Sequence, residues 1–486
     1  MNGATKPWFW RSLPLEDRTA SEVFAALFLE EDIATLLESP SIADSEYPQL
    51  SCYSICAGSP RKVNNKAKLW TPSTGEILPF LRSLLQQQTV DDPKVAHLPF
   101  TGGWLGWLGY DLAWEIESLP HQNQDTLHFP VAYWYEPECF AVLDHFQQIL
   151  WLAASNWTQL DDLQAKIILQ SSTNPPIKPS GFSQPCPPVS KKPLSQSSHS
   201  LVLDYPITFL TDQEQYQNAV ERAKEYIEAG DIFQTNLSLR FQTQTNRASW
   251  SIYRQLQQIN PSPFASYWRS PWGDVISCSP ERLVKLQENQ AETRPIAGTR
   301  KRGKDRTSDL LLAQELLSNT KERAEHIMLV DLERNDLGRV CQWGSVEVNE
   351  LLAIERYSHV MHLVSNVKGI LQSDCDTIDL IRGVFPGGTI TGCPKVRCME
   401  IIEELEPVRR SLFYGSCGYL DCRGNLDLNI LIRTLLYVPS KDPELAQVYG
   451  QVGAGIVADS DPQREWYESL NKAEAQIAAL QLTTVN

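Results

Sequence analysis

Residues 321–369 read KERAEHIMLVDLERNDLGRVCQWGSVEVNELLAIERYSHVMHLVSNVKG, and this stretch decides the fold class because its pattern changes along the chain. The segment 321–336 predicts a helix that carries apolar Met328, Leu329 and Leu332 on one side. The segment 344–357 is typical of a strand. Helix and strand follow one another without regular βαβ alternation, which favours an α+β fold over a doubly wound nucleotide-binding fold.

The same mixture continues through the C-terminal part of the chain, residues 206–486. A helix is predicted from Thr211, where Thr211 and Glu214 have capping-box spacing, to a stop at Gly230. Further helices are predicted at 394–406 and at 462–481, where Pro462 suits the first turn. Strand-like runs at 273–286 and 426–438 lie between the helices.

Residues 1–170 form an N-terminal region with a different sequence pattern. Short runs of β-branched and aromatic residues, such as 128–154, alternate with turn signals and predict sheet. The segment 171–205 separates this region from the C-terminal part. Seven prolines and nine serines fall within residues 171–200, so the segment predicts a linker or surface insertion.

Composition excludes several function classes. The 486 residues include 59 acidic and 43 basic side chains, a net charge of -16, which argues against nucleic acid or an anionic membrane surface as the main partner. No window approaches the roughly 18 apolar residues of a membrane span, and the first residues do not resemble a signal peptide. We therefore expect a cytoplasmic globular protein, in which a local basic pocket for an anionic small molecule is still allowed.

Two glycine patterns resemble phosphate-binding loops without completing them. Gly453 and Gly455 partly match a dinucleotide fingerprint, but the helix that should follow is delayed. Gly387 and Gly392 have the spacing of a P-loop that lacks its Lys-Ser/Thr pair. Both patterns are interpreted as tight turns whose backbone amides could approach a carboxylate.

A few side chains could carry chemistry. The apolar neighbours of Glu325 predict that its carboxylate points inward, while Glu468 has the spacing of a surface ion pair with Lys472. Both glutamates could be surface charges, or they could converge from separate helices as a sparse oxygen site for Mg²⁺. His362, like His359, could be a buried core histidine. Glu281 is either a turn charge or, if it faces a dry pocket, a general acid with a raised pKa.

Taken together, the motifs of residues 210–480 resemble the chorismate-binding domain of component I of aminodeoxychorismate synthase and anthranilate synthase. The matching stretches occur in the family's order and are GDIFQTNL, SPERLVKL, RPIAGTRKRG, AEHIMLVDLERNDLGRV, SHVMHLVSNVKG, PGGTITGCPKVRCMEIIEELEP, GNLDLNILIRTLLY and GAGIVADSDPQREWYESLNKAEA. The N-terminal stretches TLLESPSIADSEYPQL and PFTGGWLGWLGYDLAWEIESLP match more weakly. The resemblance implies a large α+β body of packed antiparallel sheets with outer helices, in which residues 206–486 form the catalytic domain.

The resemblance also implies roles for individual residues. Glu325 and Glu468 would hold Mg²⁺, which binds the ring carboxylate of chorismate. Arg433 and Lys472 would anchor the substrate, and the amides near Gly453 and Gly455 would bind its enolpyruvyl side. Glu281 would protonate the departing C4 hydroxyl, His362 would lie near the enolpyruvyl ether, and Thr389 would contact the substrate.

Two positions bear on the nucleophile. Relatives that form isochorismate or salicylate carry a water-activating lysine where this chain has Gln234, which favours ammonia over water. Many aminodeoxychorismate synthases have a lysine that attacks the ring where this chain has Ala297. The ammonia would come from a separate glutamine amidotransferase subunit, because this chain has no motif for glutaminase chemistry.

Different residues favour different products of chorismate amination. Ala297 and Thr389 favour anthranilate, whereas the N-terminal texture, the FPGG turn that begins at Phe385, and Phe413 favour 4-amino-4-deoxychorismate. The balance favours aminodeoxychorismate synthase component I, with anthranilate synthase component I as the alternative and a non-catalytic chorismate-fold binding protein as the second alternative. Leu36–Ser39 resembles a tryptophan-binding motif, which by itself does not establish feedback.

Overall fold

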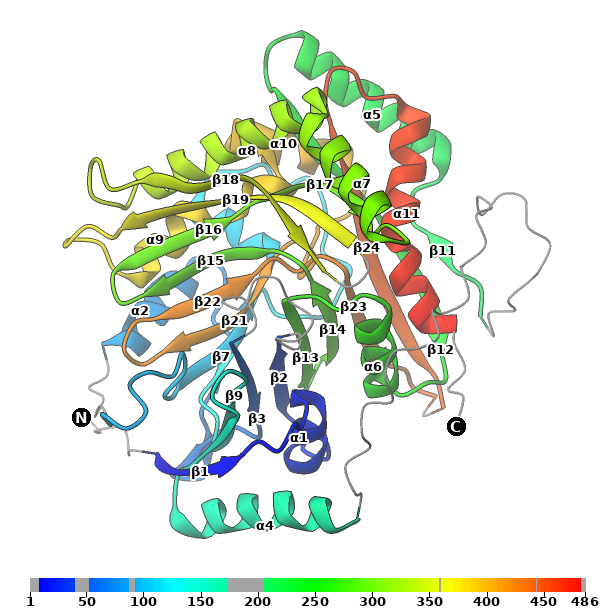
Figure 1. Ribbon diagram of the computed structural model, residues 1–486. Coiled ribbons are helices and arrows are strands. Elements are labelled where there is room, and N and C mark those ends of the chain that lie inside the picture. Colours follow the sequence, from blue (N-terminus) through cyan, green and yellow to red (C-terminus); the bar gives the residue numbers. More distant parts are fainter. Residues whose placement is uncertain are drawn as a thin grey trace.

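The computed structural model describes residues 8–39, 52–86, 92–173, 205–357, 360–442 and 444–481. The expected insertion falls largely on residues 174–204 and His359 on residues 358–359, so both lie outside the described residues. Within these ranges the chain forms two large sheets with helices outside them, and every strand pairing is antiparallel (Figure 1). The expected α+β class of packed antiparallel sheets and outer helices is confirmed.

The first sheet is assembled from both ends of the chain. From edge to edge its order is β1 (Phe9–Pro14), β10 (Ile149–Ala154), β9 (Cys139–Asp144), β3 (Tyr53–Ala57), β2 (Ala34–Glu38), β13 (Phe264–Ser270), β14 (Gly273–Ser279), β23 (Thr434–Pro439), β24 (Ala446–Ile456), β12 (Gln234–Thr245) and β11 (Thr208–Phe209), and β20 (Gly392–Cys393) also pairs with β12.

The second sheet has the same mixed origin. Its order is β17 (Ile296–Lys301), β19 (Val360–Ile370), β16 (Gln290–Arg294), β15 (Arg282–Gln287), β22 (Leu426–Asn429), β21 (Ser416–Asp421), β7 (Gly103–Leu108), β8 (Ala132–Tyr135) and β6 (Leu69–Trp70), with β18 (Glu347–Arg356) paired to β19. A small hairpin joins β4 (Lys62–Val63) and β5 (Lys66–Ala67). Strands from before and after residues 174–204 thus share both large sheets.

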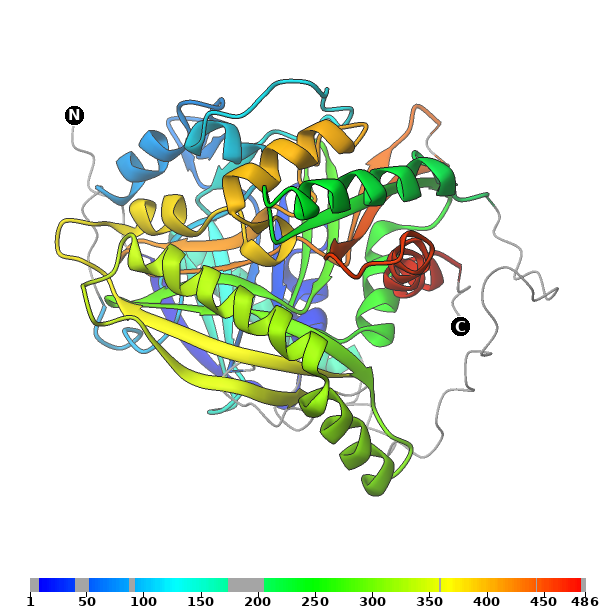
Figure 2. The ribbon, with the colours of Figure 1, turned by 90° about the horizontal axis from the view of Figure 1, so that it is seen from above.

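Helices cover the outer faces of the two sheets (Figures 1 and 2). They are α1 (Ala20–Leu27), α2 (Ile77–Leu85), α3 (Ala113–Ile116), α4 (Trp157–Thr173), α5 (Gln213–Glu228), α6 (Ser249–Ile259), α7 (Arg306–Ser318), α8 (Thr320–Gly338), α9 (Thr377–Val384), α10 (Lys395–Leu405) and α11 (Pro462–Gln481), with short 3₁₀ turns η3 (Tyr110–Leu112) and η4 (Gly388–Ile390). No helix of the described residues is long and apolar enough to span a bilayer.

Apolar packing follows these layers. One cluster joins residues from facing strands of both sheets, among them Val142, Trp268, Trp107 and Leu428. A second cluster packs the other face of the first sheet against outer helices, through residues such as Leu239 and Trp466. Burial of these side chains between layers is the main stabilising contribution, at roughly 25 cal/mol per Å² of apolar surface.

The predicted helices are present, with one local error. Helix α5 begins at the cap Asp212, whose carboxylate accepts from the Gln215 N–H while the Gln215 side chain returns to the Asp212 N–H. The expected Thr211–Glu214 box is therefore wrong by one residue. Aspartate is a better N-cap than threonine, and Thr211 is buried instead. Gly230 follows the helix at φ +83°, as a stop signal should.

Candidate functional site

The floor of the candidate site is one face of the β12–β24 pair. Gln234, Asn236 and Ser238 alternate onto the same side of β12, and the register places Gly455 opposite Asn236 and Gly453 opposite Ser238. The expected turn at Gly453 and Gly455 is therefore wrong. The pairing of β12 with β24 runs unbroken from Thr235–Ile456 to Thr245–Ala446, so both glycines are extended strand residues.

At both glycines, atoms of other residues come close to the strand. A Cβ atom at Gly453 would lie 2.4 Å from the Leu237 carbonyl and 2.9 Å from the Tyr414 hydroxyl. A Cβ atom at Gly455 would lie 3.3 Å from a carboxylate oxygen of Glu325. The lack of a side chain at Gly453 and Gly455 thus lets polar groups from other elements reach this face of β24.

Glu281 lies between β14 and β15, where the chain crosses from the first sheet to the second. The side chain is buried, and its neighbours are the hydroxyl of Thr389, the carboxylate of Glu333 and the backbone N–H of Ile296. Burial raises the pKa of the Glu281 carboxyl to about 8, against the smaller lowering effect of Thr389. At neutral pH this carboxyl is mainly protonated and can give up a proton.

Thr389 belongs to the 3₁₀ turn η4, so a turn follows Gly387 as expected, whereas Gly392 pairs with Thr235 in the short strand β20. The Thr389 carbonyl accepts a long hydrogen bond of 3.5 Å from the Asn236 amide nitrogen, which ties this turn to β12. The Thr389 hydroxyl is buried beside Glu281 but has no hydrogen-bond partner of good geometry among the described residues. The side-chain amide oxygens of Gln234 and Asn236 are also buried and have no hydrogen-bond partner of good geometry among the described residues.

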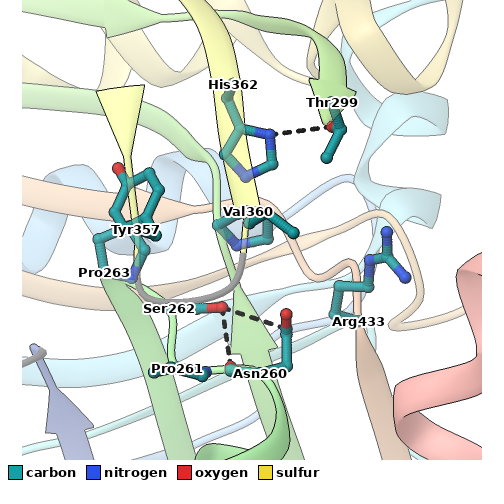
Figure 3. A pocket seen from close by; sticks show the side chains of 10 residues that line it. Asn260, Pro261, Ser262, Pro263, Thr299, Tyr357, Val360, His362 and Arg433 are labelled. Atoms are coloured by element: carbon teal, nitrogen blue, oxygen red, sulfur yellow. Dashed lines mark hydrogen bonds between the residues drawn. The ribbon is translucent and has the colours of Figure 1, made fainter. Parts of the chain in front are cut away.

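His362 lines a pocket of about 50 Å³ between the two sheets (Figure 3). Its Nδ1 lies 2.9 Å from the hydroxyl of Thr299, on the neighbouring strand β17. Burial, with a further contribution from the charge of Arg433, lowers the pKa of the His362 imidazole to about 4. The ring is therefore neutral at physiological pH, held by Thr299 and able to exchange hydrogen bonds with a bound molecule.

Arg433 lines the same pocket from the turn before β23. Its backbone is left-handed, at φ +53°, and its guanidinium donates to the carbonyl of Lys472. The Lys472 ammonium in turn donates to the Gly453 carbonyl at 2.9 Å and pairs with Glu468 at 2.9 Å. These contacts place two cations beside the β24 strand face, where an anion could be held.

Glu325 on α8 feels the charges of Glu468, Glu465 and Lys472 on α11. Burial raises the pKa of Glu325. The positive charges of Lys321 and Lys472 lower this pKa, whereas the negative charges of Glu468 and Glu465 raise it further. Glu468 is about half exposed. A divalent cation would relieve this repulsion, so the oxygen donors fit Mg²⁺, although within the described ranges no three His, Cys, Asp or Glu residues are clustered as a ready metal site.

Ala297 lies in β17, opposite Leu363, and is largely buried. Its neighbour Ile296 offers a backbone N–H to Glu281, so this part of β17 borders the acid. Ala297 itself has no group that could react. The structure thus brings the residues singled out from the sequence to the region between β12, β24, β17 and helices α8 and α11.

Several neighbours of the site had no signal of their own in the sequence. Thr299 supports His362, Glu333 adds negative charge beside Glu281, and Tyr414 reaches Gly453. Glu465 is in a stretch that was interpreted only as helix. Each of these depends on a contact between distant parts of the chain, and a strand or helix pattern does not reveal such contacts.

The stretch that resembles a tryptophan-binding motif, Leu36–Ser39, lies in and just after β2, and the Ser39 hydroxyl donates a hydrogen bond of 3.4 Å to the carbonyl of Pro263, which lines the same pocket as His362. Both oxygens of Glu38 accept hydrogen bonds from the Ser21 hydroxyl, and one also accepts from Tyr253. Burial raises the pKa of the Glu38 carboxyl. This glutamate therefore connects α1, β2 and α6 in the core.

Comparison with known proteins identifies relatives across most of the chain. A family model described as chorismate binding enzyme matches residues 41–478. An anthranilate synthase component I-like protein of Synechocystis sp. is 60% identical over 485 residues, covering 98% of this chain and 92% of the relative. Aminodeoxychorismate synthase component 1 of Bacillus subtilis is 45% identical over 385 residues, covering 79% and 78%.

A further relative and a solved structure also match the chain. An anthranilate synthase component 1 from the same Synechocystis strain is 42% identical over 402 residues, covering 79% of this chain and 77% of the relative. The crystal structure of anthranilate synthase component I from Streptococcus pneumoniae superposes with a TM-score of 0.70 at 30% identity, covering 88% of this chain and 92% of that one.

Proposed function

The chain belongs to the chorismate binding enzyme family, and on that premise we propose that it aminates chorismate with ammonia to give 4-amino-4-deoxychorismate, as component I of an aminodeoxychorismate synthase. The observation that carries the proposal is the buried Glu281 carboxyl with its pKa raised to about 8. The C4 hydroxyl of chorismate leaves as water only if it is protonated, and a neutral carboxyl in a dry site can supply that proton.

The cations around β24 would orient the substrate. Chorismate is a dicarboxylate, and Arg433 and Lys472 supply charged donors beside Gly453. Glu325 and Glu468 would hold Mg²⁺, which when bound neutralises the ring carboxylate and draws electrons from the ring. His362, neutral and held by Thr299, would lie beside the enolpyruvyl group as a hydrogen-bonding partner.

Gln234 supports ammonia as the nucleophile. Its uncharged amide is buried at the start of β12 and cannot remove a proton from water. Ammonia needs no such base, because it is nucleophilic as the free amine. The glutamine amidotransferase that releases it would be a separate subunit, as the component 1 names of the relatives suggest.

Ala297 determines which nucleophile adds to the ring first in the proposed reaction. Because this residue offers no amine, ammonia itself would add at C2 while the C4 hydroxyl departs as water. A second ammonia would then add at C4 while the C2 amine leaves, so that one ammonia is consumed for each water released. The pyruvate unit stays on the ring throughout.

Anthranilate synthesis is the second candidate, and Ala297 is the observation that favours it. The same C2 adduct becomes anthranilate if pyruvate is lost before a second ammonia attacks. Against this, identity to the Synechocystis component I-like protein is 60%, but only 42% to the anthranilate synthase component 1 of that strain. Of these two Synechocystis proteins, this chain is more similar to the anthranilate synthase component I-like protein than to the anthranilate synthase component 1.

Product analysis tests the proposal. The purified chain is incubated with chorismate, Mg²⁺ and an ammonium salt at alkaline pH, and products are identified by mass spectrometry while pyruvate is measured by a coupled dehydrogenase. Aminodeoxychorismate without pyruvate is expected. Anthranilate with equimolar pyruvate would favour the second candidate, isochorismate would contradict the argument from Gln234, and no turnover would favour a non-catalytic binding protein.

A further inference from the structure

Glu333, on the buried side of α8, is a glutamate without an ion-pair partner. The residue is 6% exposed, and among the described residues no cation lies within salt-bridge distance of its carboxylate. Glutamate is almost never buried in this way unless it is paired. The nearby ammonium of Lys395 instead donates to Asp336 at 2.5 Å and to the Val384 carbonyl at 2.9 Å. Burial of the Glu333 charge therefore carries a cost that no ion pair offsets.

The Glu333 carboxylate lies against the turn that carries Thr389. Its Oε1 is 3.5 Å from the position of a Cβ on Gly388, the first residue of η4, and the backbone N–H of Gly388 interacts with it. The hydroxyl of Thr293, on β16, also faces this carboxylate. The next residue of the turn, Thr389, faces Glu281 with its hydroxyl. The turn thus brings the buried carboxyl groups of Glu281 and Glu333 to neighbouring positions.

The charge of Glu333 acts on Glu281. Burial is the largest cause of the raised pKa of Glu281, about 8, and the negative charge of Glu333 raises it further. Burial also raises the pKa of Glu333, to about 7, which the charge of Asp336 raises and that of Lys395 lowers. These are the charged groups that face the pair from α8, α10 and the connection between β14 and β15. Glu333 therefore ionises before Glu281, and its charge then opposes the ionisation of Glu281.

Amination with ammonia needs an acid and a free amine at the same pH. Ammonia attacks only as the free amine, whose share of the total ammonium increases as pH rises. Glu281 can protonate the leaving hydroxyl only until it loses its own proton. A carboxyl group that keeps its proton to a higher pH widens the range in which both reactive forms are present.

We propose that Glu333 is a positioning residue for the acid, whose buried negative charge keeps the proton on Glu281 at the pH where free ammonia is available. The proposal rests on the proposed function, because it takes Glu281 as the group that protonates the C4 hydroxyl. Glu333 acts through Glu281, so its removal should change the pH range of the reaction rather than its rate at lower pH.

The test compares three variants of the full chain. Glu333→Gln keeps the shape of the side chain and removes its charge, whereas Glu333→Asp keeps the charge. Glu403→Gln is the matched control, because Glu403 is also a buried helix glutamate, 3% exposed, and does not contribute to the pKa of Glu281. Above about pH 7, Glu333→Gln should be at least as stable to heat as wild type, because a buried charge is gone.

The Glu281 carboxyl is titrated without substrate by difference infrared spectroscopy, against the Glu281→Gln version of each protein. In parallel, kcat/KM is measured across pH with free ammonia held constant. Both midpoints should lie near pH 8 in wild type. In Glu333→Gln both should fall by about one pH unit, the size at which neighbouring carboxyl groups titrate as a pair, with kcat/KM well below the midpoint changed less than about twofold.

The other two variants separate charge from structural damage. Glu333→Asp should stay closer to wild type than Glu333→Gln, and Glu403→Gln should keep the wild-type midpoint. A wild-type midpoint in Glu333→Gln, or an equal fall in Glu403→Gln, would overturn the proposal. The infrared titration also separates it from the proposed function. If wild type forms anthranilate or no product, the proposed function fails, but the Glu281 midpoint still decides the role of Glu333.

Discussion

The two ends of the candidate site differ in their access to water, and the difference divides the chemistry between them. At the dry end Glu281, His362 and the hydroxyl of Thr389 are buried, and burial shifts the pKa values of Glu281 and His362 towards their neutral forms. At the wet end Glu468 and Lys472 are partly exposed and form an ion pair. The dry end is suited to moving a proton, and the wet end to holding ions.

The largest effect is expected from removing the acid at the dry end. Glu281→Gln keeps the shape but cannot donate a proton, so kcat should fall by roughly 10²- to 10⁴-fold, the usual contribution of general acid catalysis. Steady-state kinetics with chorismate and ammonium salt measures it. Glu38→Gln is the control, because Glu38 is also a buried glutamate with a raised pKa and lies elsewhere in the core.

The pH dependence of kcat/KM also tests whether Glu281 is the acid. With free ammonia held constant, kcat/KM should fall as pH rises through about 8, because the Glu281 carboxyl then loses the proton that it donates. A profile that stays flat well above that pH would show that another group protonates the hydroxyl.

A smaller but clear loss is expected at the wet end. Glu468→Gln should lower Mg²⁺-dependent turnover by about 10²-fold and raise the Mg²⁺ concentration needed for half activity, because one of few anionic ligands is lost. Glu221→Gln is the matched control, since Glu221 also pairs with a lysine on a helix surface and is similarly exposed. An unchanged Mg²⁺ requirement in Glu468→Gln would refute the metal assignment.

Replacing Gln234 would add a base to the dry end. A buried lysine there would have a lowered pKa and could activate water, so Gln234→Lys should yield some isochorismate while amination falls about tenfold. Chromatography of the products measures both. Gln244→Lys, at the far end of β12, should change neither, and the absence of a water-derived product in Gln234→Lys would weaken the role given to residue 234.

The smallest effect concerns stability. Folding raises the Glu281 pKa from 4.5 to about 8, so the folded state holds a proton that the unfolded state releases between these values. Stability should therefore decline as pH rises through this window, relative to Glu281→Gln, and level off above about 8. Urea unfolding should show a difference of a few kcal/mol at most, at ~1.4 kcal/mol per tenfold change in proton affinity. A constant difference across the window would contradict the raised pKa.

Local patterns predicted much of this molecule. The helix at 462–481 and the stop at Gly230 follow from spacing and glycine chemistry, and the inward direction of Glu325 follows from its apolar neighbours. The cap of α5 was misplaced by one residue because Thr211 and Asp212 both start an acceptable box, and only burial of Thr211 separates them.

Contacts between distant strands could not be predicted in this way. Gly453 and Gly455 resemble a turn locally, and only pairing with β12 keeps them extended. Likewise, the bond between Thr299 and His362 spans 63 positions, and the place of the Tyr414 hydroxyl depends on a left-handed φ that the sequence does not signal. Such features come from the register of the sheets.

The central claim is that the dry end keeps Glu281 protonated so that the C4 hydroxyl can leave as water. Difference infrared spectroscopy between wild type and Glu281→Gln would follow the carboxyl band of this residue during a pH titration. The protonated band is expected to disappear with a midpoint near pH 8. A midpoint near the ordinary value of 4.5 would mean that Glu281 is ionised at neutral pH and cannot protonate the C4 hydroxyl.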